Sequence, residues 1–286
     1  MTICIATLCE NNKQVVAVSD RMTTAYFLEL EFEHSRMKMD ELSNCALALT
    51  SGDALAHTDL IRDVVDELAH LTIPDVRHVA KKIEEAYIKN RQCLAEKTIL
   101  QTAGMSYDDF MSGQQRLNPD LVIGLSRAYS EVELELDIIV AGVDANGAHI
   151  YGIENPGVAT CYDALGFAAI GSGLPHAMSF LTEVNYSASL TLKEALWVTY
   201  EAKRRSERAP GVGNKFTDIA IINDKGVVHL DEKVIQQLET IHETYSESLR
   251  NVQKQVDTMV KTLEIDNKEK KHKEDTYGKL KKKTTT

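Results

Sequence analysis

The chain has 286 residues, 43% of them hydrophobic, and a formal net charge of −11. This length and apolar content suit one sizeable domain, or one domain with an appendage. The negative charge disfavours broad nucleic-acid binding by the body of the protein. The sequence shows no apolar run of about 18 residues and no basic-then-apolar leader, which argues against secretion and against a membrane-spanning segment.

The cysteine and histidine content gives no metal or disulfide pattern. The cysteines are odd in number and lack CxxC spacing, so we expect neither a disulfide framework nor a zinc site, and a reducing cytoplasm as the location. The nine histidines show no HExxH or similar pairing. We therefore expect no metal and no cofactor. The cysteines are Cys4, Cys9, Cys45, Cys93 and Cys161.

The chain opens with two short apolar strands. Alternation over residues 2–7 predicts a strand buried on both faces. A tight turn at residues 10–13 joins it to a second strand over residues 14–20. Because antiparallel pairing brings the start of one strand beside the end of the next, we expect Thr2 and Asp20 at the same end of this hairpin.

Further strands and two helices follow. Residues 26–32 alternate apolar and acidic side chains, which predicts a strand with one wet face. Residues 37–42 and 45–50 predict a second hairpin, after which residues 50–53 punctuate the chain and cap an amphipathic helix. Pro74 and Asp75 open a second amphipathic helix. Residues 98–130 lack sustained periodicity and predict an inserted, partly helical excursion.

The β pattern resumes near Leu134. Strands are predicted at residues 137–142 and 149–153, followed by a short strand and the stretch 168–173. Pro175 starts a helix, Thr191 caps another, and a hairpin covers residues 218–222 and 227–230. This order predicts an α+β protein with a four-layer αββα sandwich, in which two sheets pack face to face with a helical layer outside each.

The texture changes at the end of the chain. From residue 232, apolar residues recur at steps of three and four and predict a helix of about 30 residues. Consecutive steps of four make the heptad irregular, which leaves open both a helix laid on its own domain or a neighbouring subunit and a free coiled coil. Residues 268–286 are Lys-rich and predict a disordered, solvated tail, with phosphate binding as the alternative. The expected domains are 1–231, 232–267 and 268–286.

Thr2 is the chemically distinctive residue of the first strand. Methionine aminopeptidases remove an initiator Met only when the next side chain is small, and Thr qualifies. Removal of Met1 would leave a threonine hydroxyl and a free amine on the same residue, and a threonine nucleophile needs such a nearby base. The simpler alternative is an ordinary processed N-terminal threonine.

A series of segments resembles a known family. Residues 2–6, 16–21, 38–43 and 50–54, taken in order, resemble a proteasome β-type subunit of the N-terminal nucleophile (Ntn) hydrolase superfamily. Gly171-Ser172-Gly173 and residues 216–220 extend the resemblance, which covers roughly residues 2–230 discontinuously. The long C-terminal helix and the 98–130 excursion favour a divergent, bacterial-type relative over a subunit of the main particle.

The resemblance implies a role for each of five residues. Thr2 falls on the nucleophile, and Asp20 and Lys38 complete the core around it. Ser172 falls on the serine near the threonine amine, and the backbone amide of Gly52 falls on the oxyanion donor. Taken one at a time, three of these positions have a simpler reading: a strand-end turn with a surface ion pair for Asp20-Arg21, a solvated lysine for Lys38, and a small loop residue for Ser172.

The sequence departs from the family pattern after the late helix. The family usually has an Asp and then a Ser there, which orient the N-terminal amine. In this chain residues 205–210 occupy the corresponding stretch, with a longer loop, and leave Ser206 or Glu207 as substitutes.

The resemblance implies a threonine-type peptidase that cleaves peptide bonds and assembles as a homo-oligomeric ring. Its partners would be peptide or protein substrates, with an unfoldase left open and neither nucleic acid nor membrane. Two alternatives remain: an Ntn amidohydrolase acting on a non-peptide amide, and a catalytically inactive ring or scaffold subunit.

Overall fold

A computed structural model describes residues 2–25, 30–35, 37–52, 56–69 and 75–263. The chain divides into two compact units, residues 1–238 and 239–286.

Two five-stranded antiparallel sheets form the centre of the first unit. In the first sheet the spatial order is β10 (Phe167–Ile170), β1 (Cys4–Cys9), β2 (Gln14–Ser19), β11 (Asp218–Asn223) and β12 (Gly226–His229). In the second sheet the order is β5 (Met39–Ser43), β6 (Ala46–Gly52), β7 (Leu136–Asp144), β8 (Gly147–Glu154) and β9 (Val158–Cys161). A separate two-stranded ribbon pairs β3 (Met22–Ala25) with β4 (Leu30–Glu33).

The two faces of β1 belong to two different hydrophobic cores. Cys4, Ala6 and Leu8 lie in the core between the sheets, which also holds residues of β6, β7 and β8. Ile3 and Ile5 lie in a second core, which residues of the helices after β10 complete. Alternate side chains of a strand point to opposite faces, so the predicted burial of the first strand on both sides is confirmed.

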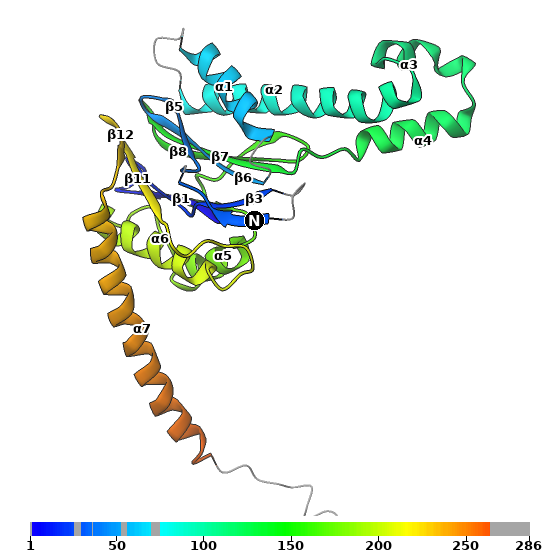
Figure 1. The fold of residues 1–286 in the computed structure, drawn as a ribbon. Helices are drawn as coiled ribbons and strands as arrows, with labels where there is room; N and C mark the ends of the chain where they lie inside the picture. Colours follow the sequence, from blue (N-terminus) through cyan, green and yellow to red (C-terminus); the bar gives the residue numbers. More distant parts are fainter. Residues whose placement is uncertain (1, 26–29, 36, 53–55, 70–74, 264–286) are drawn as a thin grey trace, which may run out of the picture. The chain divides into compact units, whose positions relative to one another are not determined.

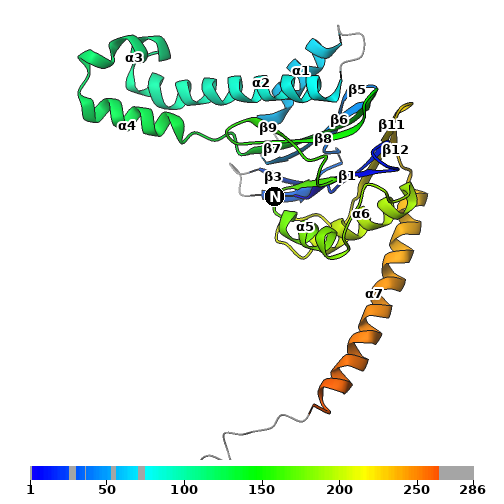
Figure 2. The same cartoon turned by 180° about the vertical axis from the view of Figure 1, so that it is seen from behind.

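Helices cover the outer face of each sheet (Figures 1 and 2). The second sheet is covered by α1 (Ala56–Leu68) and α2 (Val76–Ala95), and the first by α5 (Leu174–Glu183) and α6 (Leu192–Ser206). The predicted four-layer αββα sandwich is confirmed. The predicted cap at Thr191 is present and forms a capping box with Glu194, and Asp75, which was expected to open a helix, accepts from the backbone amide of His78.

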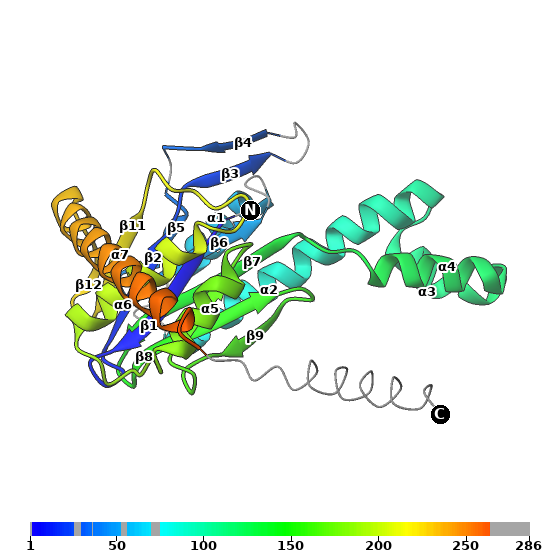
Figure 3. The same ribbon diagram turned by 90° about the horizontal axis from the view of Figure 1, so that it is seen from below.

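The predicted excursion is a helical arm that continues α2 (Figures 1, 2 and 3). A π-helical turn, Glu96–Leu100, extends α2 and packs against the two α-helices that follow. Leu100 and Phe110 are buried, whereas Ile123 is 67% exposed. The remaining elements of the arm are a 3-10 turn Gln101–Ala103, α3 (Tyr107–Gly113), a 3-10 turn Gln114–Arg116 and α4 (Pro119–Ser130).

One boundary prediction is wrong. Residues 50–52 were expected to end the strand and cap a helix, but β6 continues through Gly52, which pairs with Leu136 of β7. Pairing with the longer strand β7 extends β6 beyond the predicted turn. Other predictions lie outside the described residues: positions 26–29 of the third predicted strand, Asp53 of the predicted cap, Pro74, and the Lys-rich tail 268–286.

The C-terminal helix α7 (Glu232–Val260) begins within the first unit. Val234, Ile235 and Leu238 pack against the core beneath α5 and α6. In the second unit, Leu249, Val252 and Val256 are exposed along one stretch of the helix. The predicted domain boundary at residue 231 stays a prediction. In the part of the chain that the structure describes, no helix is long and apolar enough to cross a membrane.

Candidate active site

The hairpin of β1 and β2 sets the position of the site. Cys4 pairs with Ser19, so the residue before β1 and the residue after β2 reach the same end of the sheet. Lys38 directly precedes β5 of the second sheet, where its carbonyl accepts from the amide of Thr50 at 3.3 Å. Thr2, Asp20 and Lys38 therefore meet at one end of the sandwich.

Asp20 is a fully buried carboxylate surrounded by donors. One oxygen accepts from the amide of Gly213 at 2.6 Å. The other accepts from the hydroxyl of Thr2, from the amide of Ile3 at 3.4 Å, and from the ammonium of Lys38 at 3.4 Å. A buried charge is tolerated only when it is paired and hydrogen-bonded, and these contacts meet that requirement.

The Thr2 hydroxyl lies between a cation and an anion. Lys38 Nζ donates to Thr2 Oγ1 at 2.5 Å, and Oγ1 donates to Asp20. An ammonium can only donate and a carboxylate can only accept, so the hydroxyl must accept from one and donate to the other. Thr2 is 1% exposed, and the side chain of Lys38 is 15% exposed.

The backbone of Thr2 contacts the loop after β10. Thr2 N donates to Ser172 Oγ at 3.3 Å, and Gly173 N donates to the Thr2 carbonyl at 3.2 Å. Ser172 Oγ also donates to the Pro210 carbonyl at 3.2 Å. Ser172 therefore joins the predicted group of Thr2, Asp20 and Lys38.

Gly171 allows this loop to approach Thr2 closely. Its φ is +94°, and a Cβ there would lie 2.4 Å from the Thr2 carbonyl oxygen and 2.9 Å from both Ser51 Oγ and Thr2 Cγ2. Only glycine fits such a position, because the backbone angle and the space both exclude a side chain. Ser51 and Thr2 therefore both lie against the backbone of Gly171.

Gly52 follows Ser51 at the end of β6. Its φ is +118°, and a Cβ would lie 1.9 Å from the Glu135 carbonyl oxygen. The residue is therefore restricted to glycine at the end of the second sheet where Ser51 approaches Thr2. Its role as oxyanion donor stays a prediction.

The two proposed substitutes for the family's amine-orienting pair have other contacts. Ser206 Oγ donates to the Ala202 carbonyl at 2.9 Å. Glu207 pairs with Lys203 at 2.6 Å and with Arg204 at 3.0 Å. These contacts fix the end of α6, whereas the side chain that accepts from Thr2 N is that of Ser172.

Arg21 forms an ion pair with Asp218. The simpler reading of Asp20-Arg21 from the sequence was a strand-end turn with a surface ion pair. The Arg21 guanidinium donates to both Asp218 carboxylate oxygens, at 2.8 and 2.6 Å, and lies 5.1 Å from the centre of the Phe216 ring. A bidentate pair of this kind has a defined geometry. It joins the end of β2 to the start of β11 and leaves Asp20 to the Thr2 site.

The thiol of Cys4, which follows the site in β1, is held in its neutral form. Burial raises its pKa to about 12, and Asp20 adds to the increase while Lys38 opposes it. A thiolate is the reactive form of cysteine, so this buried neutral thiol is held in an unreactive form. Among the described residues, no group of His, Cys, Asp or Glu is arranged to hold a metal ion.

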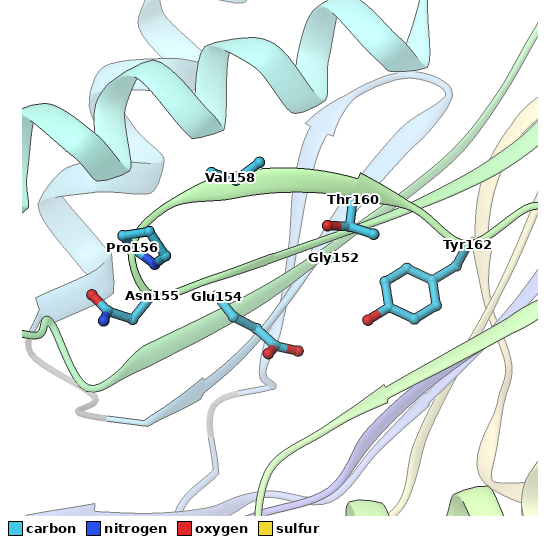
Figure 4. A pocket seen from close by; sticks show the side chains of 7 residues that line it. All are labelled: Gly152, Glu154, Asn155, Pro156, Val158, Thr160 and Tyr162. Carbon is cyan, nitrogen blue, oxygen red and sulfur yellow. The ribbon is translucent and has the colours of Figure 1, made fainter.

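A small pocket of about 210 Å³ lies where β8 turns into β9, and the side chains of Glu154, Thr160 and Tyr162 converge on it (Figure 4).

Asp137 of β7 pairs with Ser51 of β6 across the two strands. Burial, with smaller effects of Glu154 and Glu133, raises the pKa of Asp137 to about 6.

Sequence reasoning missed the amide of Gly213. The run Pro210-Gly211-Val212-Gly213 is a turn signal, but nothing in it indicates a contact with Asp20, 193 residues earlier in the chain. Only the folded arrangement of β2 beside β11 shows it.

The structure is an αββα sandwich in which the Thr2 hydroxyl lies beside a lysine and an aspartate, at the end where the first strand begins. This is the arrangement that the resemblance to Ntn hydrolases implied. A family model described as proteasome subunit matches residues 119–222. Proteasome subunit beta 1 of Korarchaeum cryptofilum (strain OPF8) is 32% identical over 114 residues, or 40% of this chain and 53% of that protein. In these segments the chain is similar to proteasome subunits.

Both matches cover only part of the chain. The chain spans about half the length of the curated relative that it matches. The family-model match includes Ser172 but begins after Thr2, Asp20 and Lys38. The grouping of those three residues therefore rests on the structure.

Substitution of Gly171 tests the close approach to Thr2. We expect Gly171→Ala to destabilise the protein by at least about 2 kcal/mol more than Gly104→Ala, because a clash with the Thr2 carbonyl adds to the backbone strain. Gly104 is the matched control: its φ is also positive, +79°, but a Cβ there meets nothing within 4 Å. Urea unfolding measures both, and equal losses would contradict the described packing.

Removal of the Asp137 charge tests the pKa assignment. A carboxyl whose pKa is raised on folding destabilises the native state above that pKa; the penalty shrinks as the pH falls below about 6 and is gone only below the ordinary carboxyl pKa of about 4. We expect Asp137→Asn to stabilise the protein by about 1 kcal/mol at pH 7.5 and by much less at pH 4.5, after allowance for partial exposure. The exposed Asp224→Asn is the control; thermal unfolding with no pH-dependent difference between Asp137→Asn and wild type would contradict the assignment.

Proposed function

We propose that this protein is a threonine-type Ntn hydrolase that cleaves peptide bonds through Thr2 after removal of Met1. The supporting observation is the Thr2 hydroxyl itself, which contacts both the Lys38 ammonium and the buried Asp20 carboxylate. Placement beside a cation stabilises the alkoxide form of a hydroxyl relative to its neutral form.

In the proposed reaction, Thr2 Oγ1 attacks the carbonyl carbon of the substrate, and its proton passes to the free Thr2 amine, directly or through one water. The amine then protonates the leaving nitrogen as the peptide C–N bond breaks. This leaves an ester between the acyl group and Thr2. Water activated by the same amine hydrolyses the ester and restores the hydroxyl.

The other residues would assist this sequence. The Lys38 ammonium favours ionisation of the hydroxyl and disfavours a charge on the amine. Asp20 holds Lys38 in place and keeps it protonated. Ser172, which contacts the Thr2 nitrogen, orients the amine. The backbone amide of Gly52 would stabilise the oxyanion, an interaction worth about 3 kcal/mol in comparable sites.

The proposed setting follows the family relationship. We propose a homo-oligomeric ring acting on peptides or proteins in the cytoplasm, with an unfoldase as a further partner. A non-peptide amide substrate and an inactive scaffold are the competing functions.

Variants of the two central side chains test the proposal. We expect Thr2→Ala to abolish cleavage of fluorogenic peptides, because it removes the nucleophile. Lys38→Ala should lower kcat by at least about a hundredfold, because the stabilising charge is lost. Initial rates over a peptide panel, with chymotrypsin-like, trypsin-like and acidic cleavage sites, measure both effects.

Lys225→Ala, in the exposed turn between β11 and β12, is the matched control and should keep wild-type rates. Full activity of Thr2→Ala would exclude the proposed mechanism. Hydrolysis of small amides but of no peptide would favour the amidohydrolase. No hydrolysis by the wild-type protein, together with retained Met1, would favour the scaffold.

A further inference from the structure

The segment between α6 and β11 contacts the candidate site at two points. Gly213 donates its amide to Asp20 Oδ2 at 2.6 Å, and the carbonyl of Pro210 accepts from Ser172 Oγ at 3.2 Å. Asp20 and Ser172, the two residues that this loop contacts, also contact Thr2. The conformation of the loop therefore affects the Asp20 carboxylate and the Ser172 hydroxyl, which lie on either side of Thr2.

Glu33, from a different part of the chain, holds this loop. It ends β4 of the two-stranded ribbon, and its carboxylate accepts from the amide of Lys215 at 3.0 and 3.2 Å. A Cβ on Gly213 would lie 2.4 Å from Glu33 Oε1 and 3.3 Å from Asp20 Oδ2. The backbone of Gly213 thus lies against both carboxylates.

The position of the ribbon agrees with this contact. In Figures 1, 2 and 3, β3 lies beside the start of the chain, at the end of the sandwich that carries Thr2. The first strand of the ribbon begins two residues after Asp20. Asp20 is therefore held from its own segment and, through Gly213, from the loop that Glu33 fixes.

We propose that Glu33 is a positioning residue for the Thr2 site; this inference rests on the proposed function. Its carboxylate fixes Lys215 and, two residues earlier, Gly213, whose amide donates to one oxygen of Asp20. With that oxygen held, the other is directed at the Thr2 hydroxyl and the Lys38 ammonium. Loss of the Glu33 carboxylate frees the loop, and Asp20 loses its fixed orientation.

The test compares Glu33→Ala with Glu33→Gln and with Glu31→Ala in the full chain. We expect Glu33→Ala to lower kcat about tenfold or more with KM within about twofold, because small misplacements of catalytic groups mainly affect the chemical step. Glu33→Gln should retain most activity, because its amide oxygen still accepts from Lys215 N. Glu31 is an exposed carboxylate on the same strand, and its replacement should change neither constant.

Hydrogen exchange supplies a readout that does not depend on catalysis. We expect the amides of Gly213 and Lys215 to exchange at least about tenfold faster in Glu33→Ala than in Glu31→Ala. Wild-type kcat in Glu33→Ala, or unchanged exchange at these two amides, would overturn the inference. If the wild-type protein cleaves no peptide, the proposed function fails separately, and faster or unchanged exchange still supports or overturns the role of Glu33 in holding Gly213.

Discussion

The buried carboxylate of Asp20 is the constraint on which the site depends. Transfer of an ionised carboxylate out of water costs several kcal/mol unless donors replace the lost hydration. Here the replacements come from the strand beside it, the loop before β11, and the lysine that precedes the second sheet. Removal of Lys38 would leave the carboxylate charge unpaired, and removal of either amide would take away a hydrogen bond that replaces its hydration, so the fold and the site stabilise each other.

The sandwich explains why such distant residues meet. The end of the β1–β2 hairpin sets Asp20 beside Thr2, and β10, on the other side of β1, brings the loop with Ser172 to the same end. The second sheet contributes Lys38 and Ser51 from the facing layer. Small side chains at Ala6 and Ala17 in the core between the sheets suit a close approach of the two layers. Glycine at position 171 then permits contact where a side chain could not fit.

Local sequence patterns were sufficient for much of this architecture. Alternation identified β1 and β2, and capping residues identified the starts of α2 and α6, because these signals act over a few residues. The grouping of Thr2, Asp20, Lys38 and Ser172 followed from the family resemblance in chain order. The contact of Gly213 with Asp20 and of Glu33 with Lys215 could not be predicted, since a backbone amide in a loop gives no sequence signal for its acceptor. The extension of β6 through Gly52 was missed because a turn-forming triplet was outweighed by pairing with β7.

The most direct test of the account is mass spectrometry of the N-terminal peptide, before and after incubation with a peptide β-lactone, which acylates activated hydroxyls. The account predicts that Met1 is absent, that the acyl group is found on Thr2, and that Lys38→Ala loses the adduct. Retention of Met1 in protein that still hydrolyses peptides, or an adduct on any residue other than Thr2, would contradict it.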